Sequence, residues 1–534
     1  MSVEGPPPVD PHRVDPIVPD HAGPGIRARF AEFGAAYPVI LLATMLTGAF
    51  ATMLAATIIN VALPSIIGAF GLGQDEAQWL STGFLAASMA AMLTNAWAVA
   101  AIGVRNSFAA AMVIFAAGSF LGAAADSLEM LVVARIMQGV AAGFVQPLPL
   151  MMIFQTFAEH RRGAALGIFS LGVVMAPALG PLIGGMAMDV FDWRFVFLVT
   201  APLALVSLPI AVLVLPRRDS TGKRPPFDAV GLALLVAAAF TMLAGLANGN
   251  RTGWSDTDTI LRLMAAGIMA LAFIAWEMGQ AFPVLNLRLF TNRTFVAGGA
   301  VVMLQGFAIY GSTFLIPLFV QGLQGYSPTQ SGLLMVPAGM AMLIGFPLAG
   351  ALSDRIDPRW LILAGMAVFG FSAWLMSGIT LDTSFGTLVW WLILSRIGIS
   401  LVMPTGNRTA IRDLPPDLIG AGAGAASFFM QFGGALGVIM LALLLQRRTL
   451  FHGQALASAT NEANVQFLYA HEMLRLEMLG LPLSPLQSFQ SAFGGISSRI
   501  AANAGTMAFQ DCFLVTAVMF VGGIALALSL PRRP

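Results

Sequence analysis

Long runs of apolar residues, separated by short polar stretches, fill most of the chain between residues 38 and 530. A helix needs about 20 apolar residues to cross the hydrocarbon core of a bilayer. Fourteen runs reach that length, and each predicts a membrane-spanning helix. They cover residues 38–64, 77–101, 106–125, 129–156, 163–188, 195–215, 228–247, 260–279, 295–320, 329–352, 360–380, 386–408, 419–445 and 507–530. The pattern therefore predicts an all-α polytopic protein that is embedded in a lipid bilayer.

Basic residues are concentrated in alternate loops between these runs. If the N-terminus is cytoplasmic, the positive-inside rule assigns the even-numbered loops to the cytoplasm. These loops carry Arg105, Arg161, Arg162, Arg217, Arg218, Lys223, Arg224, Arg288, Arg293, Arg355, Arg359, Arg408 and Arg412. The short odd-numbered loops carry mainly acids, apart from Arg194 and Arg251. A wrong helix count would scramble this alternation, so it supports fourteen spans and predicts that both termini are cytoplasmic.

Composition agrees with a membrane protein and excludes several functions. Of the 534 residues, 57% are hydrophobic and 10% are charged, whereas soluble domains carry about 25% charged residues. The net charge of +1 creates no global field that would attract nucleic acid. The single cysteine, Cys512, and the five histidines show no spacing typical of a disulfide framework or a metal site. No phosphate-binding GxxxxGK[ST] loop occurs. We therefore expect no cofactor, no metal and no enzymatic activity.

Small residues form a stripe along the run 163–188, in the stretch GVVMAPALGPLIGG. At four-residue spacing, small side chains lie on one face of a helix and let a second helix approach closely in lipid. Proline inside a helix removes a backbone donor and bends the helix. The stretch predicts either a joint about which two bundles pivot or ordinary small-residue packing. The residues concerned are Gly172, Ala176, Pro177, Gly180, Pro181, Gly184 and Gly185.

This stretch resembles the helix-5 antiporter motif of the major facilitator superfamily, and its surroundings resemble the fourteen-spanner drug:proton antiporters of the EmrB/QacA family, EmrB-like subgroup. Leu54–Pro64 (LAATIINVALP) and Arg135–Gly139 (RIMQG) resemble that family's patterns on helices 1 and 4. Gly350–Arg359 (GALSDRIDPR) resembles the superfamily's loop motif. The corresponding earlier loop, Ala96–Arg105, keeps Gly103 and Arg105, but Ala100 stands where the family has an acid.

The resemblance implies a major facilitator fold of two six-helix bundles with an inserted helix pair. The Pro-rich, polar residues 1–37 are expected to be a disordered cytoplasmic tail. Residues 38–215 would form the first bundle, and residues 216–294 would form a linker and the inserted helices 7 and 8. Residues 295–534 would form the second bundle, including an external loop over residues 447–506.

The carboxylate that usually serves as the family's proton-site candidate is missing, because Ala55 occupies its position on helix 1. No Asp or Glu lies well inside any run. Proton coupling would then use a peripheral acid such as Asp75 or Glu76, or a histidine. Alternatively, Arg135 would meet an anionic amphiphile, because a buried unpaired charge is costly until it is neutralised. A structural Arg135, bonded to backbone carbonyls of helix 1, is the third possibility.

Three functions remain open. The first is proton-driven export of hydrophobic or amphiphilic compounds, as in multidrug efflux. The second is a carrier of an anionic amphiphile, such as a fatty acid or lipid, with atypical or no proton coupling, and the third is a non-transporting scaffold subunit. We expect the cytoplasmic gate to use Gly350, Asp354, Arg355, Gly103 and Arg105. The expected substrate and coupling residues are Arg135, Gln138, Asn60, Gln146, Gln305, Tyr310, Phe428, Phe429 and Gln431. Arg396, the second-half counterpart of Arg135, is expected to be structural.

Residues 447–506 form the one sizeable segment expected outside the membrane. Ser484-Pro485 is a helix start signal, and apolar residues then recur at three- and four-residue spacing. The segment resembles the external loop of EmrB-type pumps, which implies a periplasmic membrane-fusion (EmrA-type) adaptor and, through it, an outer-membrane channel. This places the protein in a bacterial inner membrane. The expected adaptor contact is Leu486, Phe489, Phe493 and Ile496. The alternative is a lid that packs on its own protein.

Overall fold

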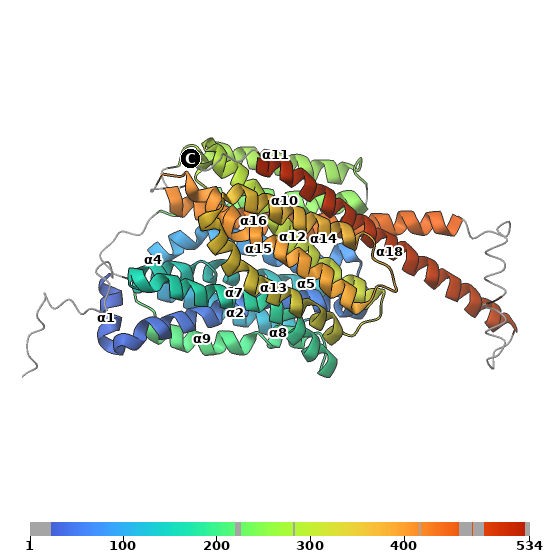
Figure 1. Cartoon of the computed structure of the whole chain (residues 1–534), viewed down its shortest axis with the longest axis horizontal. Coiled ribbons are helices and arrows are strands. Elements are labelled where there is room, and N and C mark those ends of the chain that lie inside the picture. The colour runs from blue at the N-terminus through green and yellow to red at the C-terminus, as the bar shows by residue number, and fades with distance from the viewer. Residues whose placement is uncertain are drawn as a thin grey trace, which may run out of the picture.

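The computed structural model describes residues 23–218, 226–251, 253–280, 283–415, 418–458, 473 and 485–528. All regular structure in these residues is helical, which confirms the predicted all-α class (Figure 1). The elements are α1 (Pro24–Phe33), η1 (Gly34–Ala36), α2 (Tyr37–Phe70), α3 (Gln74–Ala77), α4 (Trp79–Ala123), α5 (Leu128–Val145), α6 (Leu148–Thr156), α7 (Glu159–Val190), α8 (Phe195–Leu198), α9 (Ala201–Val214), α10 (Ala229–Arg251), α11 (Thr257–Glu277), η2 (Leu287–Thr291), α12 (Arg293–Gly322), α13 (Pro328–Arg355), α14 (Pro358–Met376), α15 (Phe385–Arg412), α16 (Ile419–Ser458) and α18 (Pro485–Leu528).

The long element α4 consists of two helices that fold back on each other at Gly103. This glycine has φ +85°, which breaks the helical geometry. Phe84 of the first arm lies against Gly139 of α5, and Gly118 of the second arm lies against Ala134 of the same helix. A straight helix would hold residues 84 and 118 about 50 Å apart. The two arms therefore run side by side and correspond to the predicted runs 77–101 and 106–125.

Twelve helical stretches of the described residues are long and apolar enough to cross a membrane. One of them, Gln74–Ala123, contains both arms of α4 and so covers two predicted runs. The predicted run 163–188 lies within α7, of which Met175–Val190 counts as a shorter apolar helix. Every predicted run thus has a helix in the structure, while the number of fourteen membrane crossings stays a prediction.

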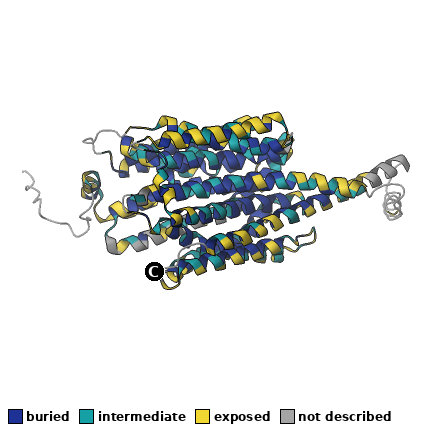
Figure 2. Cartoon of the chain, turned by 90° about the horizontal axis from the view of Figure 1, so that it is seen from above, coloured by how far each residue is buried: buried dark blue, intermediate teal, exposed yellow. Residues whose placement is uncertain are grey.

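The helices form two groups, which we call the N-half (α2–α9) and the C-half (α12–α18). One core cluster joins α1, α2, α4, α5, α6 and α9, and another joins α12–α15 and α18. Buried residues concentrate on the inner helices and exposed ones on the periphery (Figure 2). The predicted limits of the bundles stay predictions.

The pair α10 and α11 packs outside these two groups (Figure 1). Its outer face is made of large exposed apolar side chains, as expected of a helix pair that faces lipid. On α11 these include Leu261, Met264, Ile268 and Leu271.

Two helices extend well beyond the rest of the bundle. The apolar stretches Ala421–Ser458 and Gly494–Leu528 contain 38 and 35 residues, or about 57 and 52 Å of helix. A bilayer core is about 30 Å thick, so each helix continues roughly 20 Å past it. Both extensions project from the same end of the molecule (Figures 1 and 2). The predicted helix start at Pro485 is confirmed, but the helix runs on without a break into the last span, because no proline interrupts residues 486–528.

Candidate functional site

A cavity of about 100 Å³ lies between the two halves, lined by α2 and α7 on one side and by α12, α13, α15 and α16 on the other. Five methionines line it, drawn from four helices (α2, α13, α15 and α16), because two of them lie on α13. A thioether side chain has three rotatable bonds and adapts to irregular apolar shapes. Pro177 of the small-residue stretch also lies in the wall. The methionines are Met53, Met335, Met342, Met403 and Met430.

The polar side chains in the lining are few. They are Thr57, Gln146, Tyr310, Thr313 and Arg396. Two of them, Gln146 and Tyr310, belong to the predicted substrate residues. A mostly apolar wall with a few polar groups is the usual composition of a small-molecule site.

Arg396 is the one cation in this lining, and its residue is 5% exposed. Its Nη2 donates to Thr313 Oγ1 at 3.1 Å. Within the described part of the chain it forms no ion pair. Sequence reasoning assigned it a structural role, yet the structure places it in the cavity wall. One sequence feature could have indicated a place in the cavity wall: a guanidinium at membrane depth has no acidic residue nearby in the sequence.

The cavity is closed at one end by contacts between the halves. Asp189 at the end of α7 accepts hydrogen bonds from Ser327 Oγ at 3.3 Å and from the Thr329 backbone N–H at 3.2 Å. Gln321 Nε2 of α12 donates to the Val61 carbonyl of α2 at 3.0 Å. Together these bonds seal the end of the molecule from which α16 and α18 project.

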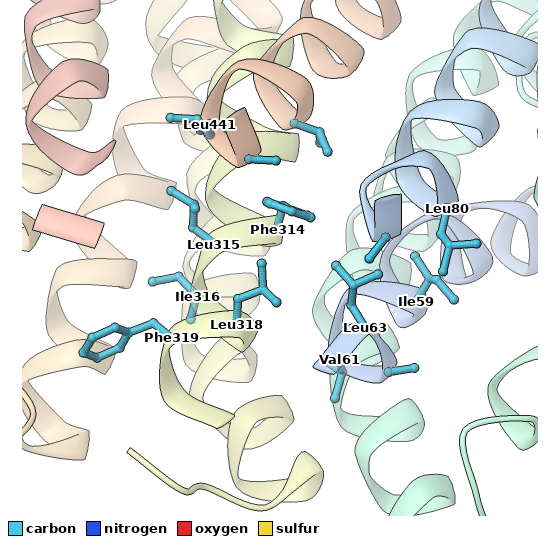
Figure 3. Packing of buried hydrophobic residues seen from close by; sticks show 14 of the residues in the cluster. Ile59, Val61, Leu63, Leu80, Phe314, Leu315, Ile316, Leu318, Phe319 and Leu441 are labelled. Carbon is cyan, nitrogen blue, oxygen red and sulfur yellow. The ribbon is translucent and has the colours of Figure 1, made fainter. Parts of the chain in front are cut away.

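An apolar layer lies beside these bonds, between α2 and α12. Figure 3 shows Phe314 and Leu318 on the side of α12 that faces Leu63 of α2, whereas Leu315 and Phe319 point away into the C-half. Their four-residue spacing puts each pair on one face of the helix. Apolar side chains therefore lie between the two halves at this end.

The small-residue stretch of α7 fits between α2 and α13. Gly172, Gly180 and Gly184 lie against Leu46, Thr57 and Ile58 of α2, and Ala176 is fully buried in the same stripe. On the next face, Gly185 meets the Pro328 backbone, and Gly332 of α13 meets the backbone of Pro181. A Cβ atom at either of those glycines would collide with backbone, which cannot move aside as a side chain can. The stretch therefore joins the halves directly.

The predicted cytoplasmic gate residues differ in their surroundings in the described structure. Gly350 has open space around it and Arg355 is exposed. The side chain of Asp354 lies outside the described residues. Gly103 packs against Arg218, which donates through Nε to the Ala100 carbonyl at 3.0 Å. Arg105 is half-buried, close to Arg217 and Arg29. A latch between the two loops stays a prediction.

Arg135 lies outside the cavity, in a network that joins α5 to α2 and α4. Its Nε donates to the Leu80 carbonyl at 2.8 Å, and its Nη1 donates to the Ala55 carbonyl at 3.0 Å and to Gln138 Oε1 at 2.8 Å. The guanidinium also lies 4.4 Å from the centroid of the Phe84 ring. Gln138 extends the hydrogen-bond network to the second arm of α4, since its Nε2 donates to Ser119 Oγ at 3.0 Å. This geometry is that of the structural alternative, because two backbone carbonyls and the Gln138 amide oxygen accept hydrogen bonds from the guanidinium.

The other predicted substrate residues are also placed elsewhere. Asn60 Oδ1 accepts from Ser81 Oγ at 3.0 Å, between α2 and α4. Gln431 Nε2 donates to Ser88 Oγ at 3.2 Å and so bridges the halves. Gln305 is buried within α12. Phe428 and Phe429 pack in aromatic and apolar clusters with Met89 and other side chains of α4, α10 and α12. Asn60, Gln431, Phe428 and Phe429 take part in contacts between helices, whereas the buried amide of Gln305 has no hydrogen-bond partner among the described residues. A role in substrate binding stays a prediction for all five.

A charged cluster between α16 and α18 was not among the predicted site residues. Asp511 accepts from Arg448 Nε, and its Oδ2 lies 2.7 Å from His452 Nε2. Nearby on α16, Gln446 Nε2 donates to Asp75 Oδ1 at 3.3 Å. Asp75 belongs to α3, so this bond connects the two halves at the sealed end. The sequence could have indicated this cluster, because Arg448, His452 and Asp511 belong to the part of the chain that resembles the external loop of EmrB-type pumps.

Comparison with known proteins agrees with this geometry. The family profile described as Major Facilitator Superfamily matches residues 45–438. The multidrug export protein EmrB of Escherichia coli (strain K12) is 26% identical over 487 residues, which cover 90% of this chain and 93% of EmrB. The fatty acid resistance protein FarB of Neisseria gonorrhoeae is 28% identical over 476 residues, which cover 88% and 92%.

The structure of a bacterial homologue of the human lysosomal transporter Spinster, in an inward-facing and unoccupied conformation, superimposes with a TM-score of 0.60. The match covers 92% of this chain and 96% of that chain, at 15% sequence identity. At that identity the likeness concerns the fold.

The different surroundings of the two buried arginines lead to a prediction about stability. Replacing Arg135 by Met removes two hydrogen bonds between helices and one within α5, and should lower the free energy of unfolding by about 2–4 kcal/mol. Replacing Arg396 by Met removes one hydrogen bond and a desolvated charge, and should leave stability unchanged or raise it. Thermal unfolding of both variants in detergent, followed by intrinsic fluorescence, checks this. An equal loss in both variants would contradict the assignment of Arg135 as the structural arginine.

Proposed function

The chain belongs to the major facilitator superfamily, and from that premise we propose that it is a secondary active exporter of hydrophobic or amphiphilic compounds. It is a multi-pass membrane transporter, and the observation that carries the finer proposal is the methionine-lined cavity between the halves, closed at one end. An adaptable apolar wall suits substrates of varied shape. Transport would open and close the cavity at alternate ends by movement of one half against the other.

The size of the cavity bears on how a substrate enters. Sites for drug-sized molecules usually measure about 300–1,000 Å³, whereas this cavity measures about 100 Å³. Binding would therefore require the halves to separate or the methionines to change rotamer. The backbone contacts of Gly185 and Gly332 let α7 and α13 act as the joint of that movement.

Arg396 favours one class of substrate, the anionic amphiphiles. It is the one cation among the described lining residues, and the only described hydrogen bond of its guanidinium is to a neutral hydroxyl. A buried charge of this kind gains most from a ligand that brings the opposite charge into the same apolar space. The relative FarB is named for fatty acid resistance, which supports the same class. The proposal thus moves the anion-binding role considered for Arg135 to Arg396.

The proposed drive is the proton gradient, with the Asp511 cluster as the proton site. Ala55 cannot carry a proton, and its carbonyl instead accepts from Arg135. Imidazole is the side chain that most readily exchanges a proton near neutral pH, and His452 contacts Asp511 directly. The Gln446–Asp75 bond next to this cluster joins the halves, so a change of charge there can alter closure of the sealed end. Glu277, which is buried on the inserted pair and accepts from the Val284 backbone at 3.1 Å, is the competing candidate.

The projecting ends of α16 and α18 form the proposed contact with a periplasmic adaptor of the membrane-fusion type, and through it with an outer-membrane channel. The helices extend roughly 20 Å past the bilayer core, estimated from their length. Ile496 lies half-buried on this extension, whereas the side chains of Leu486, Phe489 and Phe493 lie outside the described residues. The proposed location is a bacterial inner membrane, with both termini in the cytoplasm as the loop charges favour.

Replacing Arg396 tests the substrate class. In proteoliposomes with an imposed proton gradient, Arg396→Gln should transport a dansyl-labelled fatty acid about 30-fold less well or worse, because a buried charge pair is lost. Transport of a neutral hydrophobic dye should stay within about twofold of the wild-type rate, since it makes no such pair. Arg396→Lys, which keeps the charge, should retain part of the fatty-acid transport. Equal losses for both substrates would contradict the anion proposal while leaving export itself in place.

Substrate-induced proton release from the purified protein tests the coupling. Adding the fatty-acid probe to a weakly buffered solution should release protons from the wild type and from Glu277→Gln. Release should be absent from His452→Gln and Asp511→Asn, because both changes disrupt the proposed proton site. Saturable binding without any release from the wild type would exclude proton antiport and favour a carrier with another drive.

Site-specific cross-linking tests the adaptor contact. A benzophenone side chain introduced at Ile496 should cross-link to a co-expressed membrane-fusion adaptor upon illumination. The matched control is the same side chain at Met264, which lies on the lipid-facing side of α11 and is 58% exposed. Equal cross-linking at both positions, or none at Ile496, would favour a lid that serves only this chain.

A further inference from the structure

A second cavity, of about 380 Å³, lies at the opposite end of the molecule from the projecting helices. It is an open cavity that is lined by the first turn of α1, the fold-back of α4 around Gly103, Gln155 at the end of α6 and the segment Pro216–Arg218 after α9. Each of these elements marks the end of a membrane-spanning stretch. The cavity therefore lies at the depth where a bilayer has its headgroups.

The N-terminal helix α1 supports this depth. It crosses the end of the bundle beside α9 (Figure 1). Ile26 and Phe30 are buried in the N-half core, and the Phe30 ring lies 5.0 Å from the ring of Tyr37. Arg27 and Arg29 lie on the same short helix. A short helix with one apolar side packed inward and basic residues on the other is typical of a membrane interface.

The cavity is positively charged. Arg217 and Arg218 line it, and the bond from Arg218 Nε to the Ala100 carbonyl fixes the direction of that guanidinium. Arg105 lies near enough to Arg217 and Arg29 for their charges to repel it. No acidic residue occurs among the described residues of the lining. The first turn of α1 also contributes the positive end of a helix dipole.

We propose that this cavity binds a phosphate group, supplied by the headgroup of an anionic phospholipid. Paired guanidiniums and a helix N-terminus are the donors that recognise a phosphate oxygen. Basic pockets between spans at a membrane surface bind anionic headgroups. A lipid held here would tie α1, the α4 fold-back and the end of α9 together, and would offset the repulsion among the arginines.

The test compares the full-length protein with Arg217→Gln/Arg218→Gln. The matched control is Arg288→Gln/Arg293→Gln, which removes two exposed arginines outside the cavity. Phosphatidylglycerol is titrated into each detergent-solubilised protein, and binding is measured by native mass spectrometry and by the shift in thermal unfolding. Phosphatidylcholine and inorganic phosphate are the two comparison ligands.

The proposal expects phosphatidylglycerol to bind the wild type and the control alike, and to bind the cavity variant about 30-fold more weakly, at roughly fivefold per arginine. Phosphatidylcholine should stabilise none of the three. Inorganic phosphate acting as well as the lipid, and losing its effect in the cavity variant, would confirm the phosphate site and assign it to a soluble ligand. Equal phosphatidylglycerol binding by the cavity variant and the control would overturn the proposal. Transport plays no part in the readout, so the result is independent of the proposed function.

Discussion

The cost of placing a guanidinium inside a bilayer shapes this molecule more than any other interaction. An arginine at membrane depth needs acceptors that the lipid cannot supply. Arg135 obtains them from the carbonyls of Leu80 and Ala55 and from Gln138. In doing so it fixes the distances between α2, the first arm of α4 and α5. Arg396 has one hydroxyl partner in the described structure and opens onto the cavity. The same side chain thus stabilises one half and leaves a binding capacity in the other.

Close backbone packing between helices is the second feature on which the structure depends. In lipid, helices gain little from burying apolar side chains, so contacts depend on shape and on the absence of bulk. Gly172, Gly180 and Gly184 bring α7 against α2, while Gly185 and Gly332 bring α7 against α13. The contacts between α7 and α13 join the halves at the backbone, without large side chains between these two helices. A movement of one half against the other then needs few rotamer changes, which fits a joint better than a fixed core.

Much of the fold could be predicted from the sequence because membrane spans are encoded locally. Twenty apolar residues and the charge of the next loop suffice to place each helix, and every predicted run coincides with one. The fold-back at Gly103 and the start of the last helix at Pro485 were also readable, since glycine and proline mark them. The sequence did not predict that α18 is one continuous helix. An amphipathic helix and a membrane span have no visible boundary when no helix-breaking residue separates them.

The candidate site was harder to predict, because it depends on which side chains from distant helices meet. Gln146 and Tyr310, two of the expected substrate residues, line the cavity, and their role in binding stays a prediction. Asn60 and Gln431 are just as polar, yet they bond to Ser81 and Ser88. The surroundings of Arg135 and Arg396 could not be predicted for the same reason. One arginine has backbone carbonyls within reach and the other does not, and sequence spacing cannot report that difference.

Two alanines show how the chain accommodates the loss of acidic residues. The family resemblance leads to acids at the positions of Ala55 and Ala100, where a carboxylate would have been available to a nearby arginine. In the structure the backbone carbonyl of each alanine accepts a hydrogen bond from an arginine, Ala55 from Arg135 and Ala100 from Arg218, both at 3.0 Å. A carbonyl satisfies the donor but does not neutralise the charge. The charges of Arg135 and Arg218 lie at two levels of the N-half, in the middle of the membrane and at its surface. At the surface that charge borders a cavity large enough for a headgroup, whereas at membrane depth it is enclosed by helices. The same substitution of a carbonyl for a carboxylate thus has a structural result in one place and offers a binding site in the other.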